Sequence, residues 1–306
     1  MTALIPTISY DVLYSNLQET ADWLESIGVS IKKRRRFTRV LKLTRLASEQ
    51  YKSKSLEKLT QYAERHIVEN ALVQALEFRE VFNTCHEAPL SESLLNKIRE
   101  AMSGPLLDTD ESSEDGSNRF RNTLFEFRVC NRLRKAGIDA HTAEDIDFVF
   151  NSSPYNIQCK RPVSASAVRN RLIEAREQIR TAKQNNKKTF GIVAISLDKI
   201  SGIDGQFLTA PDEASVHTES SKIVERFVKE NESFWDNICQ NLVIWIFCFI
   251  SYYAKIKTKN LLTAVFFMGA WEPAWIVKAE NRHTRNIQKM GQQLKESDPL
   301  TMTMEQ

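Results

Sequence analysis

The chain has 306 residues, of which 42% are hydrophobic and 26% are charged, a composition that is typical of a globular protein and leaves room for two cores. Its first residues lack the basic and apolar segments of a secretory signal, and the longest apolar run, residues 242–250, is too short to cross a bilayer. Five widely spaced cysteines without a CxxC pair indicate reduced thiols, and the five histidines show no zinc-ligand spacing. These features predict a cytoplasmic protein without a membrane span.

The net charge of +3 is unevenly distributed along the chain. Residues 119–189 hold 15 Lys and Arg against 7 Asp and Glu, whereas residues 104–118 hold five acids and no base. A strongly basic segment of this kind indicates binding to the phosphate backbone of nucleic acid. The alternative is a set of solvated helix faces, which is the commoner origin of charge runs.

Residues 1–103 are predicted to form a helical domain. Leucines at helical spacing indicate an amphipathic helix within residues 1–30, and residues 56–101 keep the same periodicity with few glycines or prolines. Between them, residues 32–45 carry eight cations and no acid, which predicts a basic helix that faces nucleic acid. Its candidate contact residues are Arg34, Arg35 and Arg39. The alternatives are a solvated helix and a helix at the interface of a homodimer.

Residues 104–118 (GPLLDTDESSEDGSN) are acidic and rich in serine, which indicates a flexible linker. They divide the chain into the helical domain, a second domain at residues 119–285 and a C-terminal tail at residues 286–306. The tail is polar and is expected to fray.

The second domain opens with an amphipathic helix. Apolar residues at helical spacing predict that this helix runs from about residue 119 to residue 136, and Gly137 stands where a left-handed C-cap would follow. Glu126 lies on the helix between Phe125 and Phe127. A charge between two phenylalanines needs something to offset it. The alternatives to a role in a site are an ion pair with Lys135 two turns on, an ion pair with a cation from elsewhere in the fold, and a solvated carboxylate.

Two short strands follow this helix. Residues 145–150 and residues 155–160 each alternate between apolar and polar side chains, which is the period of a half-buried strand. Residues 151–154 (NSSP) between them favour a turn. The pattern therefore predicts an antiparallel hairpin with one apolar face and one polar face.

The polar face of this hairpin carries acids, an amide and a lysine. A four-residue loop pairs the residues on either side of it, and in that register Asp147 faces Gln158 while Asp145 faces Lys160. These four side chains would then converge on one side of the sheet. The alternative is that the two acids are ordinary solvated residues and that Lys160 protects a sheet edge.

This arrangement resembles the PD-(D/E)XK nuclease superfamily, whose pattern is a helix glutamate, a strand aspartate and an acid-x-lysine on the next strand. Glu126 stands at the position of the glutamate, Asp147 at that of the aspartate and Lys160 at that of the lysine. Gln158 stands where the family usually has an acid, which is a departure from the pattern. The resemblance covers roughly residues 118–197. It implies an α+β or α/β core in which helices flank a central mixed β-sheet.

The resemblance also implies a nuclease that depends on Mg²⁺ or Mn²⁺. Asp147 would be the main metal ligand, and Glu126 would bind the metal directly or through water. The Gln158 side chain and the Cys159 carbonyl would add neutral oxygen ligands. Lys160 would hold the attacking water or stabilise the developing charge. Because Gln158 removes one negative charge, the site would suit a one-metal enzyme or an inactive relative that only binds nucleic acid.

The rest of the second domain continues as the resemblance implies. A helix is predicted over residues 167–185, capped by Ser164 or Ser166, and a buried strand over residues 189–197. The residues here that are candidates for contacts to nucleic acid are Arg161, Arg176, Gln178 and Arg180.

The last third of the chain has weaker signals. Residues 198–218 are predicted to be a loop and residues 220–238 a helix. Residues 242–253 and 261–271 are rich in aromatic and β-branched side chains and are predicted to be strands, with a helix pair as the alternative. Taken together, the sequence favours a metal-dependent nuclease with DNA as the preferred substrate. The alternative is a non-catalytic nucleic-acid-binding or assembly protein.

Overall fold

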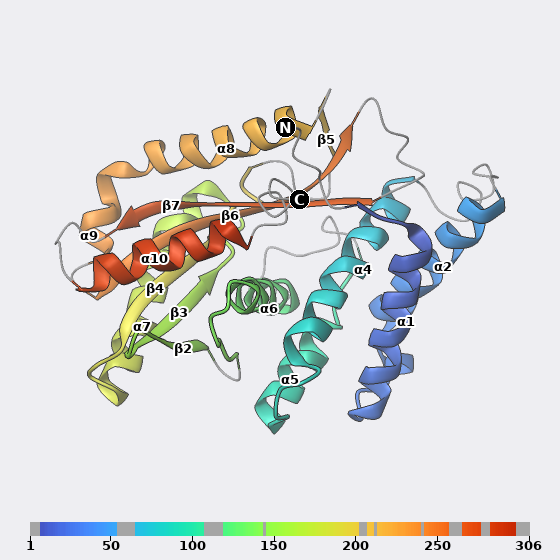
Figure 1. Cartoon of the computed structure of the whole chain (residues 1–306), viewed down its shortest axis with the longest axis horizontal. Coiled ribbons are helices and arrows are strands. Elements are labelled where there is room, and N and C mark those ends of the chain that lie inside the picture. Colours follow the sequence, from blue (N-terminus) through green and yellow to red (C-terminus); the bar gives the residue numbers. More distant parts are fainter. Residues whose placement is uncertain are drawn as a thin grey trace.

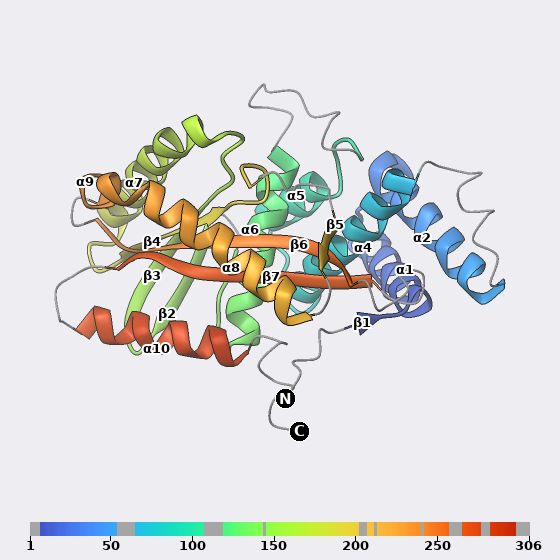
Figure 2. The ribbon, with the colours of Figure 1, turned by 90° about the horizontal axis from the view of Figure 1, so that it is seen from above.

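A mixed β-sheet carries helices on both faces and has a layer of further helices at one end (Figures 1 and 2). The structure is a computed structural model. The residues that it describes are 7–53, 65–106, 119–142, 145–201, 207–210, 213–239, 242–256, 265–276 and 282–297. The chain is therefore α+β, as the sequence predicts.

The described strands are arranged in the order β1-β7-β6-β4-β3-β2, and β5 pairs with one end of β6. Their bounds are β1 Thr7–Ile8, β2 Ile146–Phe150, β3 Ser153–Lys160, β4 Phe190–Ser196, β5 Phe207–Ala210, β6 Val243–Ile256 and β7 Val265–Ile276. The strands β3, β4 and β6 are parallel, while β2 and β7 are antiparallel to their neighbours. Adjacent residues of β4, such as Ile192 and Val193, enter cores on opposite faces. This double burial explains the continuous apolar run that predicted β4.

Helices cover both faces of this sheet. The helix bounds are α1 Tyr10–Ser26, α2 Arg35–Ser53, α4 Arg65–Cys85, α5 Glu92–Ala101, α6 Arg119–Lys135, α7 Val168–Asn185, α8 Glu213–Glu230, α9 Trp235–Cys239 and α10 Arg282–Glu296. One face packs against α7, α8 and α9, and the other packs against α6 and α10. None of the helices within the described ranges is long and apolar enough to cross a membrane.

The helix α6 belongs to two cores, that of the helical layer and that on one face of the sheet. Its residues Leu124 and Phe127 are buried with α1, α2, α4 and α5 in the helical layer. Its residues Phe125 and Leu133 are buried against the sheet. The helical layer and the sheet therefore share one helix, although the sequence separates them by the predicted linker. Residues 107–118 of that linker lie outside the described part of the chain.

The C-terminal end of α6 is as predicted. Gly137 has a φ of 75°, in the left-handed region that a side chain disfavours. The amide of Gly137 donates to the carbonyl of Arg134 at 2.9 Å, and the amide of Ile138 donates to that of Leu133 at 3.0 Å. These bonds cap the helix and turn the chain toward β2.

The β2–β3 hairpin has a tighter turn than the sequence predicts. Phe150 pairs with Ser153, so the loop contains only Asn151 and Ser152, whose φ values of 47° and 62° define a type I′ turn. The predicted four-residue loop is therefore wrong. Its register is wrong by two residues, because the residue opposite Asp147 is Asn156 and not Gln158.

Replacing Ser152 with glycine is expected to stabilise the protein. Ser152 is held at a positive φ, which costs a residue with a side chain about 1–2 kcal/mol, whereas Asn-Gly is a preferred pair for a type I′ turn. We expect the free energy of unfolding in urea to rise by about 0.5–1 kcal/mol. The matched control is Ser166→Gly, a change at another exposed serine outside such a turn. A loss of stability in Ser152→Gly would contradict the turn geometry.

The C-terminal part of the chain departs from prediction in three places. The strand β5, Phe207–Ala210, lies within the predicted loop of residues 198–218. The helix predicted over residues 220–238 begins earlier, as α8 at Glu213, within the predicted loop, and a second helix, α9, ends at Cys239. Residues 282–296 form α10, whose Ile287, Met290 and Leu294 are buried against the sheet. The predicted C-terminal tail is therefore wrong over this stretch. The long strands β6 and β7 confirm the prediction of strands there and exclude the helix pair.

The start of α7 also differs from prediction. Its N-cap is Ala167, which makes no side-chain capping bond. The hydroxyls of Ser164 and Ser166 lie 2.9 Å apart and bond to each other. The predicted serine cap is therefore wrong, although the predicted helix is confirmed.

Candidate functional site

The polar face of the β2–β3 hairpin contains the same side chains in the observed register as in the predicted one. A two-residue shift moves each side chain to a new opposite partner but keeps it on the same face of the sheet. Ile146, Phe148, Tyr155 and Ile157 are buried in the core below the hairpin. The residues that alternate with them on the opposite face are Asp145, Asp147, Asn156, Gln158 and Lys160.

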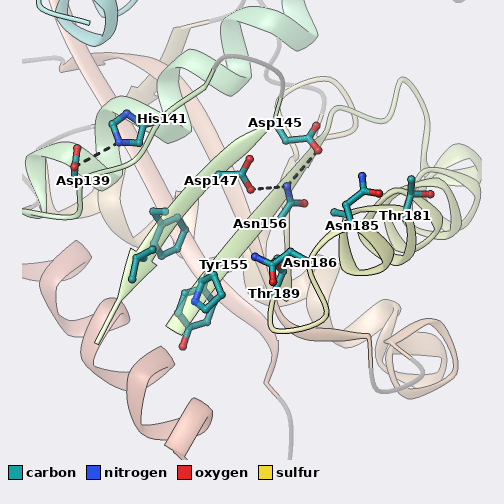
Figure 3. A pocket seen from close by; sticks show the side chains of 14 residues that line it. Asp139, His141, Asp145, Asp147, Tyr155, Asn156, Thr181, Asn185, Asn186 and Thr189 are labelled. Atoms are coloured by element: carbon teal, nitrogen blue, oxygen red, sulfur yellow. Dashed lines mark hydrogen bonds and ion pairs between the residues drawn. The ribbon is translucent and has the colours of Figure 1, made fainter. Parts of the chain in front are cut away.

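Asn156 connects the polar groups of this face. Its Nδ2 donates to Asp147 Oδ1 at 2.9 Å and to Asp145 Oδ2 at 3.2 Å (Figure 3). Its Oδ1 accepts from Gln158 Nε2 at 2.9 Å. Asn156 is only 2% exposed and Gln158 only 4%, and buried amides of this kind need such partners. The amide side chains therefore orient both carboxylates.

Of the two hairpin aspartates, the register places Asp145 nearer than Asp147 to Gln158 and Lys160. Asp147 is paired with Asn156, so Lys160 lies four residues further along β3, roughly 13 Å away along the strand. Extending the same register by one pair beyond Ile146 and Ile157 brings Asp145 opposite Gln158. The predicted pairings of Asp147 with Gln158 and of Asp145 with Lys160 are therefore both wrong, because the register moves each aspartate two residues along β3.

Glu126 reaches the same region from α6. Its Oε2 lies 2.6 Å from the Nζ of Lys97, a residue of α5, and Lys97 Nζ also donates to Thr142 Oγ1 at 3.4 Å. Burial raises the pKa of Glu126, the nearby Lys97 and Lys160 oppose this shift, and Asp145 adds to it. Asp145 and Lys160 are therefore both within electrostatic reach of Glu126.

Lys160 is oriented by the helix that follows its strand. Its Nζ donates to Gln178 Oε1 of α7 at 2.5 Å. Burial lowers the pKa of Lys160 from its usual value, and Glu174 of the same helix partly restores it. Lys160 is thus a partly desolvated lysine with a fixed direction, which the sequence predicted as a partner of the acids. The Cys159 side chain points to the other face, where burial raises the pKa of its thiol.

A pocket of about 640 Å³ opens beside the two aspartates (Figure 3). Asp145, Asp147 and Asn156 of the hairpin form one wall. The other wall includes Thr181 and Asn185 from the C-terminal part of α7. The pocket gives solvent, and a ligand, direct access to the acids.

The predicted nucleic-acid contacts are dispersed rather than gathered at the hairpin. Arg35 and Arg39 are exposed on α2, which lies in the helical layer away from the hairpin (Figures 1 and 2). Arg34 donates to Ser103 Oγ at 2.9 Å, and Arg161 is only 7% exposed.

Two of the predicted contacts on α7 are already engaged in ion pairs. Arg176 and Arg180 both contact the carboxylate of Glu177. Of the three predicted residues on this helix, only Gln178 has a described hydrogen bond to a residue of the site, which it accepts from Lys160.

Sequence reasoning missed two residues of the site. Asn156 lies two positions before Gln158 and four before Lys160, so the strand alternation alone could have included it. Lys97 lies in a different predicted domain, and no local pattern connects it with Glu126.

Few charged donors are available for a cation at this face. Within the described ranges, no cluster of three or more histidine, cysteine, aspartate or glutamate side chains has the geometry to hold a metal ion. Mg²⁺ requires only one or two carboxylates when water and phosphate oxygens complete its shell, and Asp145 and Glu126 would be those carboxylates here. A magnesium-type ion at this site would therefore be bound mainly by water and substrate.

The chain was also compared with known proteins. No family model, no curated protein and no solved structure matches it. The functional argument therefore depends on the site itself.

Proposed function

We propose that this protein is a metal-dependent nuclease that hydrolyses phosphodiester bonds of nucleic acid, with DNA as the favoured substrate. The observation that carries the proposal is the polar face of the hairpin, where Asn156 donates to both Asp145 and Asp147 and where Gln178 orients Lys160. Glu126 of α6 is close enough for Asp145 and Lys160 to influence its pKa. A pair of acids beside a partly desolvated lysine is a set of groups that phosphodiester hydrolysis uses. The fixed direction of Lys160 adds to this support.

The order of elements around the site supports the same proposal. The helix α6 carries the glutamate, Asp145 directly precedes β2, the antiparallel strand β3 carries the lysine, and α7 crosses over to the parallel strand β4. This order resembles the arrangement of the PD-(D/E)XK nucleases. The isolated pairing of His141 with Asp147 adds a further strand-like contact beside β2.

The acids would hold the metal ion. Asp145 would be its main ligand, Glu126 would bind it directly or through water, and the Gln158 oxygen and the Cys159 carbonyl would be neutral donors. Asp147, which the sequence predicts as the main ligand, would orient Asn156 instead. When bound, the cation would neutralise charge on the phosphate and make its water a stronger nucleophile.

Lys160 would act on the reacting groups. In hydrolysis the water oxygen forms a new bond to phosphorus, the bond to the leaving oxygen breaks, and that oxygen takes up a proton. An ammonium that Gln178 holds in place can direct the water and stabilise the negative charge that develops on the phosphoryl oxygens. Its lowered pKa brings Lys160 closer to exchanging a proton under working conditions.

A non-catalytic nucleic-acid-binding protein is the second candidate, and one observation favours it. The carboxylates already have cationic or hydrogen-bonding partners in the chain, since Asn156 donates to both aspartates and Lys97 pairs with Glu126. Together with Gln158 in place of an acid, these contacts could stabilise a site that has lost its metal. The exposed cations of α2 would then provide the binding.

Cleavage assays decide between the two candidates. Single- and double-stranded DNA and RNA would be incubated with the protein and Mg²⁺ or Mn²⁺. We expect metal-dependent cleavage, and we expect Lys160→Met to slow it about 100-fold. Lys187→Met removes a charge from an exposed position after α7 and is expected to leave the rate unchanged.

The opposite result would favour the binding protein. If no substrate is cut by the parent protein, but nucleic acid still binds with a steep salt dependence, the nuclease proposal fails. If Lys187→Met and Lys160→Met reduce cleavage equally, Lys160 has no specific part in the reaction.

A further inference from the structure

Lys97 belongs to the helical layer, yet its ammonium group lies inside the candidate site. It stands on α5, whose Leu94 and Ile98 are buried in the core of that layer. Its Nζ lies 2.6 Å from Glu126 Oε2, and the side chains of Lys97 and Glu126 are only 16% and 26% exposed. An ion pair that is this close and this sheltered is stronger than a pair on the surface.

The position of Lys97 is fixed by more than its charge. The neighbouring residues of α5 pack on both sides of it, and its Nζ also donates to Thr142 Oγ1, which follows α6 on the way to β2. Lys160 is directed toward Gln178 instead. The cation in contact with Glu126 is therefore supplied by the helical layer and not by the sheet.

We propose that Lys97 controls metal binding at this site by occupying the cation position at Glu126. The inference rests on the proposed function and adds a form of regulation to it. A divalent ion that coordinates Glu126 has to displace the ammonium or share the carboxylate with it, and two cations a few ångströms apart repel each other. The parent protein is therefore a weak metal binder, in which Lys97 substitutes for the ion in the resting site.

This arrangement couples the metal to the helical layer. Lys97 moves with α5, so any displacement of α5 that withdraws the ammonium makes Glu126 available to the metal. By thermodynamic reciprocity, metal binding at Glu126 weakens the attachment of Lys97 to the site by the same factor. Nucleic acid bound to the helical layer could use this coupling to activate the site only when substrate is present.

Direct measurement of Mn²⁺ binding tests the inference without relying on activity. The full chain would be titrated with Mn²⁺, and free Mn²⁺ would be followed by electron paramagnetic resonance. We expect Lys97→Met to bind Mn²⁺ at least about tenfold more tightly than the parent, because one positive charge beside the ion is removed. Lys97→Arg keeps the charge and is expected to bind as weakly as the parent.

Two further variants control for indirect effects. Lys135→Met removes an exposed lysine of α6 that pairs with Glu80, and it is expected to leave the affinity unchanged. Adding Glu126→Gln to Lys97→Met is expected to abolish the gain, because the carboxylate that becomes available is gone. Thermal unfolding would verify that each variant is folded, and Mn²⁺ is expected to raise the melting temperature of Lys97→Met more than that of the parent.

The outcomes separate this inference from the nuclease proposal. Equal Mn²⁺ affinities in the parent and Lys97→Met, or no binding in either, would overturn the control by Lys97. Tighter binding in Lys97→Met without cleavage of any substrate would support the inference and overturn the nuclease. If cleavage depends on Asp145 and Lys97→Met has no effect on Mn²⁺ binding, the nuclease proposal is supported and the control by Lys97 is overturned.

Discussion

Asp145→Asn is expected to lower the rate of metal-dependent cleavage about 1000-fold, whereas Asp147→Asn is expected to lower it less than about tenfold. The two aspartates lie on the same face and both accept a hydrogen bond from Asn156, so they look equivalent by local contacts. The register distinguishes them. Extended by one pair it brings Asp145 opposite Gln158, and Asp145 raises the pKa of Glu126, whereas Asp147 is paired with Asn156, four residues before Lys160.

Single-turnover cleavage at saturating Mn²⁺ would measure this difference. Each variant is the control for the other. Each replaces one carboxylate that accepts a hydrogen bond from Asn156, so the two changes should affect stability to a similar degree. A larger loss in Asp147→Asn than in Asp145→Asn would make Asp147 the main metal ligand, as the sequence predicts. Small losses in both variants would remove the hairpin acids from the catalytic site.

Most of the secondary structure was predictable because its signals are local. The helices α6 and α7 and the strand β4 show their apolar periodicity within a single window of residues, and the structure confirms all three. Gly137 could be identified as a cap for the same reason, since only the residues of one helical turn decide it. The α+β class follows from these elements alone.

The hairpin register was not predictable from periodicity. A shift of two residues keeps every apolar side chain on the core face, so the hydrophobic pattern fits both registers equally well. The turn decides between them, and its two residues adopt positive φ values although Ser152 is not a residue that favours them. The sequence therefore predicted the correct face and the wrong pairing, and this error exchanged the roles of Asp145 and Asp147.

Contacts between distant segments account for the remaining errors. Lys97 and Glu126 are separated by a stretch that reads as a linker, so they were assigned to different domains although one core contains parts of both. The helix α10 is polar overall, and this obscured the apolar stripe formed by Ile287, Met290 and Leu294. That stripe has helical spacing and could have predicted the helix.

Glu77→Gln is expected to destabilise the protein by about 3–5 kcal/mol. Glu77 of α4 is the shared partner of three buried arginines from two other helices. Its carboxylate lies 3.6 Å from Arg36 of α2, and 3.4 Å and 2.8 Å from Arg121 and Arg128 of α6. The side chains of these arginines are 9% exposed or less, so the loss of the carboxylate would remove their shared counter-charge from a region with little water, and Asp198, 3.5 Å from Arg128, would replace it only in part.

Urea denaturation of the parent and the variant would measure the free energy of unfolding. Glu19→Gln is the matched control, because Glu19 is 58% exposed and pairs with Arg79 at the surface, so its replacement is expected to cost less than about 1 kcal/mol. Since α6 carries two of the arginines and also Glu126, loosening this cluster should weaken the pairing of Glu126 with Lys97. Equal stabilities of Glu77→Gln and Glu19→Gln would mean that the three arginines are neutralised by other partners, and that the helical layer does not depend on Glu77 to hold α6 beside the sheet.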